Sequence, residues 1–477
     1  MILTSTSRSF PKSPTPRRNR RSFAACTLAL GLFAGVAQAE LCDGIDITAP
    51  RQGDLDCVER WIEVEQSWPQ GARAQATTGL AELREDAEQL SDAEYYLRVA
   101  ELVALADNGH TGLSRGAARA KFGLLPIRNV FFEDGLFVVR ATTEHRRLLG
   151  AEILDIGGLT PARLMDAMGR YAGGPEESFK AYEHTVLFLS PALLHAAGLT
   201  ESSDSLTLRL RLADGQEESV ELPIYAGDKQ PTSFPWRHLN PDPLEGEEDG
   251  WVSWPTEIGV ELPWALEDPS ELFRYRFLAD AGLAHIQLRA NASSDGQDIK
   301  EFLAQLSRRL KTDKPTHILW DQRWNSGGDL SKTSDFARRL HRYLPKHGRV
   351  YAATSNATFS AGIYTAFFPE HVDDERTVVI GTRAGDREVF WAESEGPIVL
   401  PHSKWRIYYS LGMHDLADGC HDRERCHIRK KRRQIAVGSF DPEVEIPWLS
   451  TDAAAGRDVI LDHVLSKVGD KMQAPSP

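Results

Sequence analysis

Residues 316–362, THILWDQRWNSGGDLSKTSDFARRLHRYLPKHGRVYAATSNATFSAG, place two apolar runs on either side of a segment with helical spacing. With the residues before them, they alternate as strand, helix, strand, helix and strand: LAHIQL (283–288), DIKEFLAQLSRRLK (298–311), THILWDQR (316–323), SKTSDFARRLHRYL (331–344) and RVYAAT (349–354). This alternation predicts a mainly parallel sheet with crossover helices. The predicted fold class is therefore α/β for the C-terminal half, within a chain that is mixed α+β overall.

Two loops follow strands of this sheet, DQRWNSGGDL (321–330) and SNATFSAG (355–362). Active residues of parallel sheets gather at the carboxyl ends of the strands. Gly327 and Gly328 allow the backbone to approach a substrate with its N–H groups, and Ser360 precedes a helix-like segment whose dipole favours developing negative charge. This arrangement suits acyl transfer. Serine is also among the best helix-capping residues, so Ser360 has two interpretations at this point.

The N-terminal residues predict an export signal. Four arginines between residues 17 and 21 precede the apolar run FAACTLALGLFAGVAQA (23–39), which is short for a membrane span and ends in a small-residue cleavage pattern. We interpret residues 1–39 as a signal peptide for general secretion or, through Arg20-Arg21, for twin-arginine export. Its removal takes away six basic residues and changes the formal net charge from −14 to −20. Such a charge does not suit nucleic acid or an anionic membrane.

The cysteines fit an oxidising compartment. Cys26 leaves with the signal peptide, and the other four form pairs that are close in sequence, Cys42 with Cys57 and Cys420 with Cys426. Four cysteines allow three connectivities, and closeness in sequence favours this one. The second pair lies in CHDRERCHIRKKRR (420–433), whose Cys and His spacing departs from that of usual zinc sites, so a disulfide and no metal are expected. No later apolar run approaches about 20 residues, so no integral membrane segment is expected, and we expect a periplasmic or secreted protein.

The chain ahead of the sheet domain has three parts. Residues 40–124 predict a helical segment that ends in the loop around His110, which alone would be an ordinary solvated side chain. Residues 125–224 predict short strands, and NVFFEDGLFVVRAT followed by GAEILDIGG and an amphipathic helix resembles a PDZ-like module, which would bind an extended peptide at a sheet edge. A β-rich module without a ligand is the alternative. Residues 225–270, rich in Pro, Trp, Glu and Asp, predict a linker or surface excursion before the C-terminal domain (271–477).

Five motifs, taken in order, resemble the C-terminal-processing (tail-specific) serine peptidases and their tricorn-core-like branch. They are NGHTGL (108–113), DQRWNSGGDL (321–330), TFSAG (358–362), VVIGTRAGD (378–386) and FDPEVEIPWLSTDAAAGRDVILDHVL (440–465). The resemblance covers most of residues 95–466. It implies a ClpP/crotonase-like peptidase domain that requires no cofactor.

The resemblance implies roles for individual residues. Ser360 matches the nucleophile, and Ala361 with Gly327 or Gly328 matches the N–H donors of the oxyanion hole. The better-known branch activates its serine with a lysine in a turn that here reads Gly385-Asp386-Arg387, and arginine stays protonated and cannot act as a base. The tricorn-like branch uses a histidine in a loop ahead of the sheet domain, and His110 matches it.

Two features of the family pattern do not match clearly. The third, orienting group has Asp441 as its candidate and Glu393 as the alternative, and neither aligns with a family position. Relatives also carry a Gly-Glu-Pro-Thr-Gly-Gly turn where this chain has Gly381-Thr382-Arg383-Ala384-Gly385-Asp386, which changes one wall of the site.

The resulting hypothesis is an exported serine peptidase that hydrolyses peptides or unfolded protein chains through an acyl-enzyme intermediate. A catalytically silent peptide-binding protein of the same fold is one alternative, and an esterase or amidase for a small molecule is another. No cofactor, metal or nucleic acid is expected, and the sequence leaves the substrate and the oligomeric state open.

Overall fold

The computed structural model describes residues 41–46, 48–227, 234–244, 247, 250–294, 296–394, 396–422, 424–427 and 434–469. The expected signal peptide (1–39) lies outside these residues. None of the helices described is both long enough and apolar enough to cross a membrane.

A six-stranded sheet organises the C-terminal half of the described chain, in the order β17-β12-β11-β10-β9-β8. Its strands are β8 (Phe273–Leu278), β9 (Leu283–Leu288), β10 (His317–Asp321), β11 (Val350–Thr354), β12 (Thr377–Gly381) and β17 (Val444–Glu445). Each neighbouring pair is parallel except β8 with β9. The predicted α/β class with a mainly parallel sheet is confirmed.

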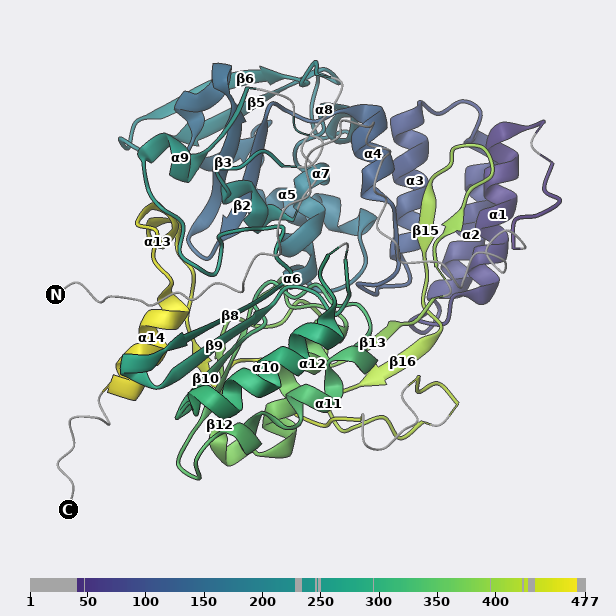
Figure 1. Cartoon of the computed structure of the whole chain (residues 1–477). Helices are drawn as coiled ribbons and strands as arrows, with labels where there is room; N and C mark the ends of the chain where they lie inside the picture. The colour runs from purple at the N-terminus through teal and green to yellow at the C-terminus, as the bar shows by residue number, and fades with distance from the viewer. Residues whose placement is uncertain are drawn as a thin grey trace, which may run out of the picture.

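Helices cover both faces of this sheet (Figure 1). Helices α10 (Ile299–Asp313) and α12 (Ala361–Val372) pack on one face, and α14 (Val459–Gly469) packs on the other. Every residue of β9, β10, β11 and β12 is buried, as expected for parallel strands that are covered on both sides.

Helix α10 illustrates why the local sequence forms these elements. Asp298 accepts a hydrogen bond from the backbone N–H of Glu301 and caps the helix, and Lys314 ends it in a left-handed conformation with φ 47°. Its buried residues recur at helical spacing: Ile299, Phe302, Leu303, Leu306 and Leu310.

The helix expected over residues 331–344 is instead three short turns. They are η6 (Leu330–Lys332), α11 (Ser334–Ala337) and η7 (Leu340–Tyr343). The hydroxyl of the fully buried Thr333 bonds to Asn291 and Thr365, which holds the backbone there out of a continuous helix. The periodic apolar pattern was correct about burial and wrong about helix length.

The N-terminal half combines helices with an antiparallel sheet. The helices are α1 (Pro50–Val64), α2 (Ala72–Asp86), α3 (Asp92–Ala104), α4 (Arg115–Phe122), α5 (Pro161–Met168), α6 (Glu176–Ser178), α7 (His184–Leu187) and α8 (Pro191–Ala196). The sheet has the order β2-β3-β4-β5-β6: β2 (Ile127–Phe132), β3 (Gly135–Thr142), β4 (Glu152–Ile156), β5 (Ser205–Arg211) and β6 (Glu217–Pro223). One continuous buried cluster joins these helices to the sheet.

The segment from 225 to 270, expected to be a linker or surface excursion, contributes to this core. Strand β7 (Trp251–Ser253) pairs with β3, and Trp236 and Trp254 are buried, Trp254 in helix α9 (Trp254–Ile258). The buried Arg140 guanidinium explains the difference, because it pairs with Glu247 at 2.6 Å and donates to the carbonyl of Asn240. Composition alone does not reveal that an interior arginine organises the segment.

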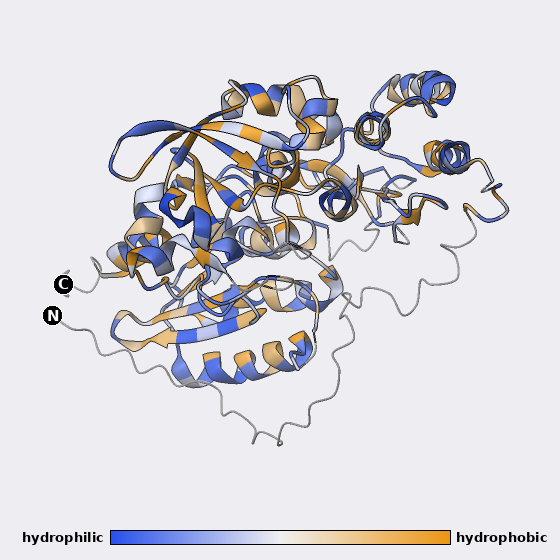
Figure 2. Cartoon of the chain, turned by 90° about the horizontal axis from the view of Figure 1, so that it is seen from above, coloured by the Kyte–Doolittle hydropathy of each residue, from blue (hydrophilic) through white to orange (hydrophobic). Residues whose placement is uncertain are grey.

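The last strands return to the N-terminal helices. They are β13 (Val389–Ala392), β14 (Ile398–Val399), β15 (Arg406–Tyr408) and β16 (Gly412–Asp415), and α13 (Ser450–Ala454) lies near the chain end. Strand β15 pairs with β1 (Gly112–Leu113) and runs beside α1 and α3 (Figure 1). Hydrophobic and hydrophilic residues alternate along the helices, as expected for helices with one buried face (Figure 2). The pairing of β1 brings the His110 loop, just before it, to the C-terminal half.

Candidate active site

Ser360 occupies a sharp turn between strand β11 and helix α12. Its backbone has φ 54° and ψ −130°, a conformation that residues other than glycine rarely adopt, and its side chain makes no capping hydrogen bond. The Phe359 N–H donates to the carbonyl of Asn325 at 2.9 Å, which joins this turn to the loop after β10. The serine stands at the helix N-terminus without serving as its cap, so helix capping does not account for the residue.

Gly327 and Gly328 lie directly against this turn. Both have positive φ, 101° and 127°. A Cβ atom added at Gly327 would lie 2.6 Å from the Cβ of Ser360 and 3.1 Å from the backbone nitrogen of Ala361, so any side chain there would fill the space beside the serine. The structure therefore brings together Ser360, Ala361 and the glycine pair, as the sequence motifs suggested.

The two glycines differ in what their N–H groups do. The Gly327 N–H donates to the side-chain oxygen of Asn325 at 3.0 Å. The Gly328 N–H has no hydrogen-bond acceptor in the part of the chain described. Of the two glycines considered as oxyanion donors, Gly328 is therefore the one with an available N–H.

A buried amide network holds the glycine loop against helix α12. Asn325 donates to the side-chain oxygens of Asn291 and Gln322, both at 2.8 Å, and Asn291 donates to the carbonyl of Ala361 at 3.0 Å. All three amide side chains are fully buried. In the sequence analysis, Asn325 was one residue of the DQRWNSGGDL motif and had no role of its own. Asn291 lies outside the motifs and was missed.

An ion network fixes the start of the same loop. Arg323 donates to Asp321 at 2.8 Å and to Asp458 at 2.9 Å, and His285 lies 3.1 Å from Asp321. Burial opposes the ionisation of Asp321, yet the charge and hydrogen bonds of Arg323 and His285 bring the pKa of its carboxyl below the ordinary value. The network ties the loop to the residue before α14.

The imidazole of His110 lies beside the serine turn, between two aromatic rings. It stacks on Phe359, the residue before Ser360, at a centroid distance of 4.3 Å and an interplanar angle of 23°, and on Phe390 of β13 at 5.3 Å and 9°. Its side chain is 15% exposed. A histidine 250 positions earlier in the chain is thereby placed at the serine turn.

The carboxylate beside His110 belongs to Asp386. Its Oδ2 lies 3.3 Å from Nδ1 of His110, and the Asp386 side chain is only 2% exposed. The contact has ion-pair distance without hydrogen-bond alignment, and Oδ2 has no other polar partner among the described residues. A buried carboxylate oxygen with no other polar contact than an imidazole nitrogen is a natural orienting group for that ring.

The turn that carries Asp386 contacts both the serine loop and the histidine loop. The Gly385 N–H donates to the carbonyl of Thr358 at 2.9 Å, and the Arg387 guanidinium donates to the carboxylate of Asp107 at 2.9 Å. Arg387, at the position compared with the family lysine, therefore links the turn of Asp386 to the histidine loop.

Hydrogen bonds to strand β13 and to the end of helix α1 also hold the histidine loop. Asn108 donates to the carbonyl of Trp391 at 2.9 Å and accepts from its N–H at 3.1 Å. Thr111 donates to the carboxylate of Glu65, at the end of α1, at 2.9 Å, and burial raises the pKa of Glu65. These partners fix the loop on both sides of His110.

The earlier candidates for the third group lie elsewhere. Asp441 is 68% exposed and bonds to Arg383 and Ser439, both at 2.8 Å. Glu393 contacts His414 and His427 at 3.4 and 3.6 Å. The structure places Asp386, and not Asp441, beside His110, because Asp441 pairs with Arg383 instead. The closeness of Asp386 to His110 depends on a tertiary contact that no local pattern encodes. The one sequence signal for Asp386 was its position in the turn where the related peptidases carry their lysine.

The cysteine pairs are as expected. Cys42 pairs with Cys57, and Cys420 pairs with Cys426. Across the described ranges, no group of three or more His, Cys, Asp or Glu side chains is placed to hold a metal ion.

Comparison with solved structures identifies the fold. A structure of mature CPAF in complex with lactacystin aligns with 91% of this chain and 98% of its own, with a TM-score of 0.51 and 13% identity. A second structure of mature CPAF aligns with 91% of this chain and 99% of its own, with the same score and identity. The photosystem II D1 C-terminal processing protease aligns more weakly, with a TM-score of 0.37, 12% identity, and coverage of 86% and 98%. No family model matches the sequence, and no curated protein matches it either. The chain has the fold of CPAF over nearly its whole length.

Proposed function

We propose that this protein is an exported serine peptidase that hydrolyses peptides or unfolded protein chains through an acyl-enzyme intermediate. The observation that carries the proposal is the convergence of the distant His110 with Asp386 and the strained Ser360 turn. The similarity of the fold to that of mature CPAF, over 91% of the chain, also supports the proposal.

Ser360 supplies the nucleophile. Its Oγ attacks the scissile carbonyl carbon, and the oxygen of that carbonyl takes up negative charge as the tetrahedral intermediate forms. The N–H groups of Ala361 and Gly328 donate to this oxygen, and the N-terminus of α12 adds favourable electrostatic potential. Gly327 keeps the space open, because a side chain there would meet Ser360.

His110 transfers the protons. Its Nε2 accepts the hydroxyl proton of Ser360 and returns it to the departing amine, and a water molecule then hydrolyses the acyl-enzyme by the same route. Asp386 keeps the proton of the neutral ring on Nδ1, so that Nε2 is free to accept. The 3.3 Å contact is not aligned as a hydrogen bond here, and catalytic hydrogen bonds often tighten only when substrate is bound.

The residues before the sheet domain extend this proposal. Residues 1–39 direct export, and the two disulfides suit an oxidising compartment. The sheet β2–β6 acts as a PDZ-like module that holds an extended stretch of substrate by adding it as a strand at one of its edges.

Labelling with a serine-directed fluorophosphonate tests the function. We expect the folded protein to be labelled at Ser360, the Ser360→Ala variant not to react, and the heat-unfolded protein to lose labelling. Labelling at another serine would contradict the assignment of Ser360, and no labelling of the folded protein would contradict the proposal and favour a silent binding protein. Hydrolysis of a peptide library but not of small esters would then distinguish a peptidase from an esterase.

A further inference from the structure

A pocket lies between the antiparallel sheet of the N-terminal half and the carboxyl ends of β11 and β12. Its cavity volume is about 70 Å³. Six aromatic residues line it: Phe131, Tyr182, Phe234, Trp236, Trp324 and Trp448. Aromatic residues from both halves of the molecule therefore form part of its wall.

The aromatic residues of the wall contact one another in two groups. The rings of Trp236 and Trp324 stack at 5.5 Å and 25°, and Trp448 meets Trp324 edge-on at 5.5 Å. Tyr182 meets Phe234 at 5.7 Å on the other side. Such rings hold an aromatic side chain by offset or edge-to-face contact, which favours a ring over an aliphatic chain.

The charged groups of the pocket are largely compensated. Arg323 pairs with Asp321 and Asp458, and Lys180 pairs with Glu176 at 2.5 Å. The remaining acid, Glu133, is exposed, and partial desolvation raises its pKa. A charged ligand side chain would find little unpaired opposite charge here, whereas an apolar one would lose contact with water.

Two donors in the wall have no partner. The indole nitrogens of Trp236 and Trp324 are buried and have no hydrogen-bond acceptor within the described residues. Because neither nitrogen is accessible, a ligand in the pocket would meet the ring carbons of these indoles and not their N–H groups.

The pocket adjoins the serine turn. Ser355, Asn356 and Ala357 line it, and Ala357 is three residues before Ser360. The Tyr182 hydroxyl donates to the carbonyl of Ala357 at 3.1 Å, and its ring lies 5.9 Å from that of Phe359. Trp324 comes from the loop that carries Gly327 and Gly328. One wall of the pocket is thus built by the two loops of the candidate active site.

We propose that this pocket binds an aromatic side chain of the peptide substrate close to the scissile bond, in contact with the rings of Trp236 and Trp324. This inference rests on the proposed peptidase function and names its substrate preference. Tyrosine and phenylalanine are the preferred residues, and acidic residues are the poorest.

Binding is tested first without catalysis. The Ser360→Ala variant is titrated with fluorescently labelled peptides that differ at one central position, Phe, Ala or Asp, and fluorescence polarisation is recorded. Burial of one aromatic side chain predicts binding at least about tenfold tighter for Phe than for Ala. Phe234→Ala, at a half-buried position, and Ala181→Leu, which fills the pocket, should each remove most of this difference. Ile258→Ala, an exposed apolar position outside the pocket, should preserve it.

Cleavage of the same peptides by the protein with Ser360 intact separates the two proposals. Cleavage that favours Phe, together with discriminating binding, supports both. Discriminating binding without any cleavage supports the pocket and overturns the peptidase. Cleavage with equal binding and equal kcat/KM for the three peptides overturns the pocket and leaves the peptidase. Loss of discrimination in Ile258→Ala as well as in Phe234→Ala would also overturn the pocket assignment.

Discussion

The backbone of Ser360 is held in a conformation that costs an L-residue about 1–3 kcal/mol. That cost is offset by the surrounding contacts: the Phe359 ring is stacked on His110, and its N–H is bonded to the loop of the glycine pair. The same contacts that strain the serine therefore also place the histidine. This coupling is why Ser360 and His110 are expected to act together.

The first prediction concerns this pair. Ser360→Ala and His110→Ala should each reduce turnover by orders of magnitude, because general-base help is typically worth about 10² to 10⁴ in rate. Residues that act as a unit are non-additive, so the double variant should be little worse than the more damaged single variant. Steady-state kinetics on a chromogenic peptide measures this. Near wild-type turnover in His110→Ala would exclude histidine as the base.

The second prediction separates the two aspartates. Asp386→Asn should reduce kcat by roughly 10²-fold or more, because an amide stabilises neither the required tautomer nor the imidazolium. KM should change little, since Asp386 does not line the pocket. Asp441→Asn is the matched control and should retain activity within about twofold, as an exposed surface ion pair contributes little. Equal loss in both variants would show that Asp386 has no special role.

Residue types and order were enough to propose Ser360, His110 and the glycine pair, because each belongs to a local motif. Asp386, Asn291 and Glu65 could not be found this way. Each acts through a contact with a distant residue, and an isolated Asp, Asn or Glu in a loop has no distinguishing local pattern. The sequence indicated the groups that we propose to react and not the groups that hold them.

At the scale of elements, strands β9, β10 and β11 and helix α10 lie within one or two residues of the predicted ranges. Continuous apolar runs and a capped amphipathic helix are strong local signals. Two predictions were wrong: one continuous helix over 331–344, and a linker or surface excursion over 225–270. Buried polar groups, Thr333 and Arg140, determine the paths of these segments. Burial of a polar side chain depends on partners that come from elsewhere in the chain.

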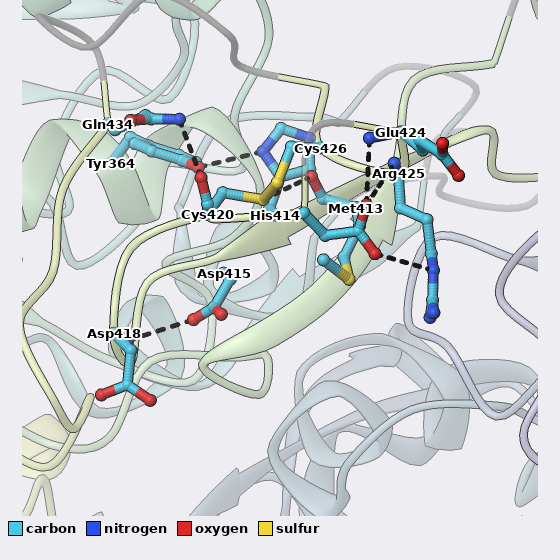
Figure 3. Close-up of a disulfide and its surroundings, with 11 residues drawn as sticks. Tyr364, Met413, His414, Asp415, Asp418, Cys420, Glu424, Arg425, Cys426 and Gln434 are labelled. Carbon is cyan, nitrogen blue, oxygen red and sulfur yellow. Dashed lines mark hydrogen bonds and ion pairs between the residues drawn. A yellow bond between two sulfur atoms is a disulfide. The ribbon is translucent and has the colours of Figure 1, made fainter.

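The hairpin of β13 and β16 supports the histidine from the side opposite Phe359. Phe390 of β13 stacks on His110 with one face and on His414 of β16 with the other, at 4.9 Å. Figure 3 shows the Cys420–Cys426 disulfide beside His414, whose Nδ1 lies 3.0 Å from the Tyr364 hydroxyl of α12. His427 donates its backbone N–H to the carbonyl of Met413 at 3.0 Å. The disulfide thus closes a short loop onto β16.

The third prediction concerns this disulfide. The double variant Cys420→Ser/Cys426→Ser should lose about 2 kcal/mol of stability in the hairpin, the amount expected for closing so short a loop. Hydrogen exchange should quicken at the amides of β13 and β16 and stay unchanged in β9 to β12. The pair Cys42→Ser/Cys57→Ser is the control and should leave the hairpin amides unaffected. Free thiols at both 420 and 426 in the native protein under non-reducing conditions would contradict the pairing.

Over the whole molecule, the site exists only because distant parts of the chain meet. The N-terminal helices carry His110, the parallel sheet carries Ser360 and the glycines, and the last strands return to pair with β1 beside the histidine loop. The buried cluster of the N-terminal half includes Trp324 and Ala357 from the active-site loops. A substitution that loosens that core is therefore expected to disturb the candidate site as well.

The fourth prediction concerns that stability and its dependence on pH. Glu370, near the end of α12, has a carboxylate oxygen that is buried and has no hydrogen-bond partner among the residues described. Burial, with the nearby charges of Glu443 and Asp374, raises its pKa from 4.5 to about 7. A carboxyl that holds its proton more tightly when folded favours folding at low pH. Its contribution is present below about pH 4.5 and is lost as the pH rises through about 7.

Glu370→Gln should therefore raise the free energy of unfolding at pH 8 and change it little at pH 4. One pKa unit corresponds to about 1.4 kcal/mol, and partial exposure of the side chain reduces the full effect, so we expect a gain of about 1–2 kcal/mol at pH 8. Urea unfolding at the two pH values measures the difference, with the exposed Glu375→Gln as the control. The amide keeps the shape of the carboxylic acid without its charge, so a gain at pH 8 isolates the cost of burying that charge. An equal change at both pH values would mean that the substitution acts through packing of α12, and a loss at pH 8 would mean that the ionised carboxylate has a stabilising partner.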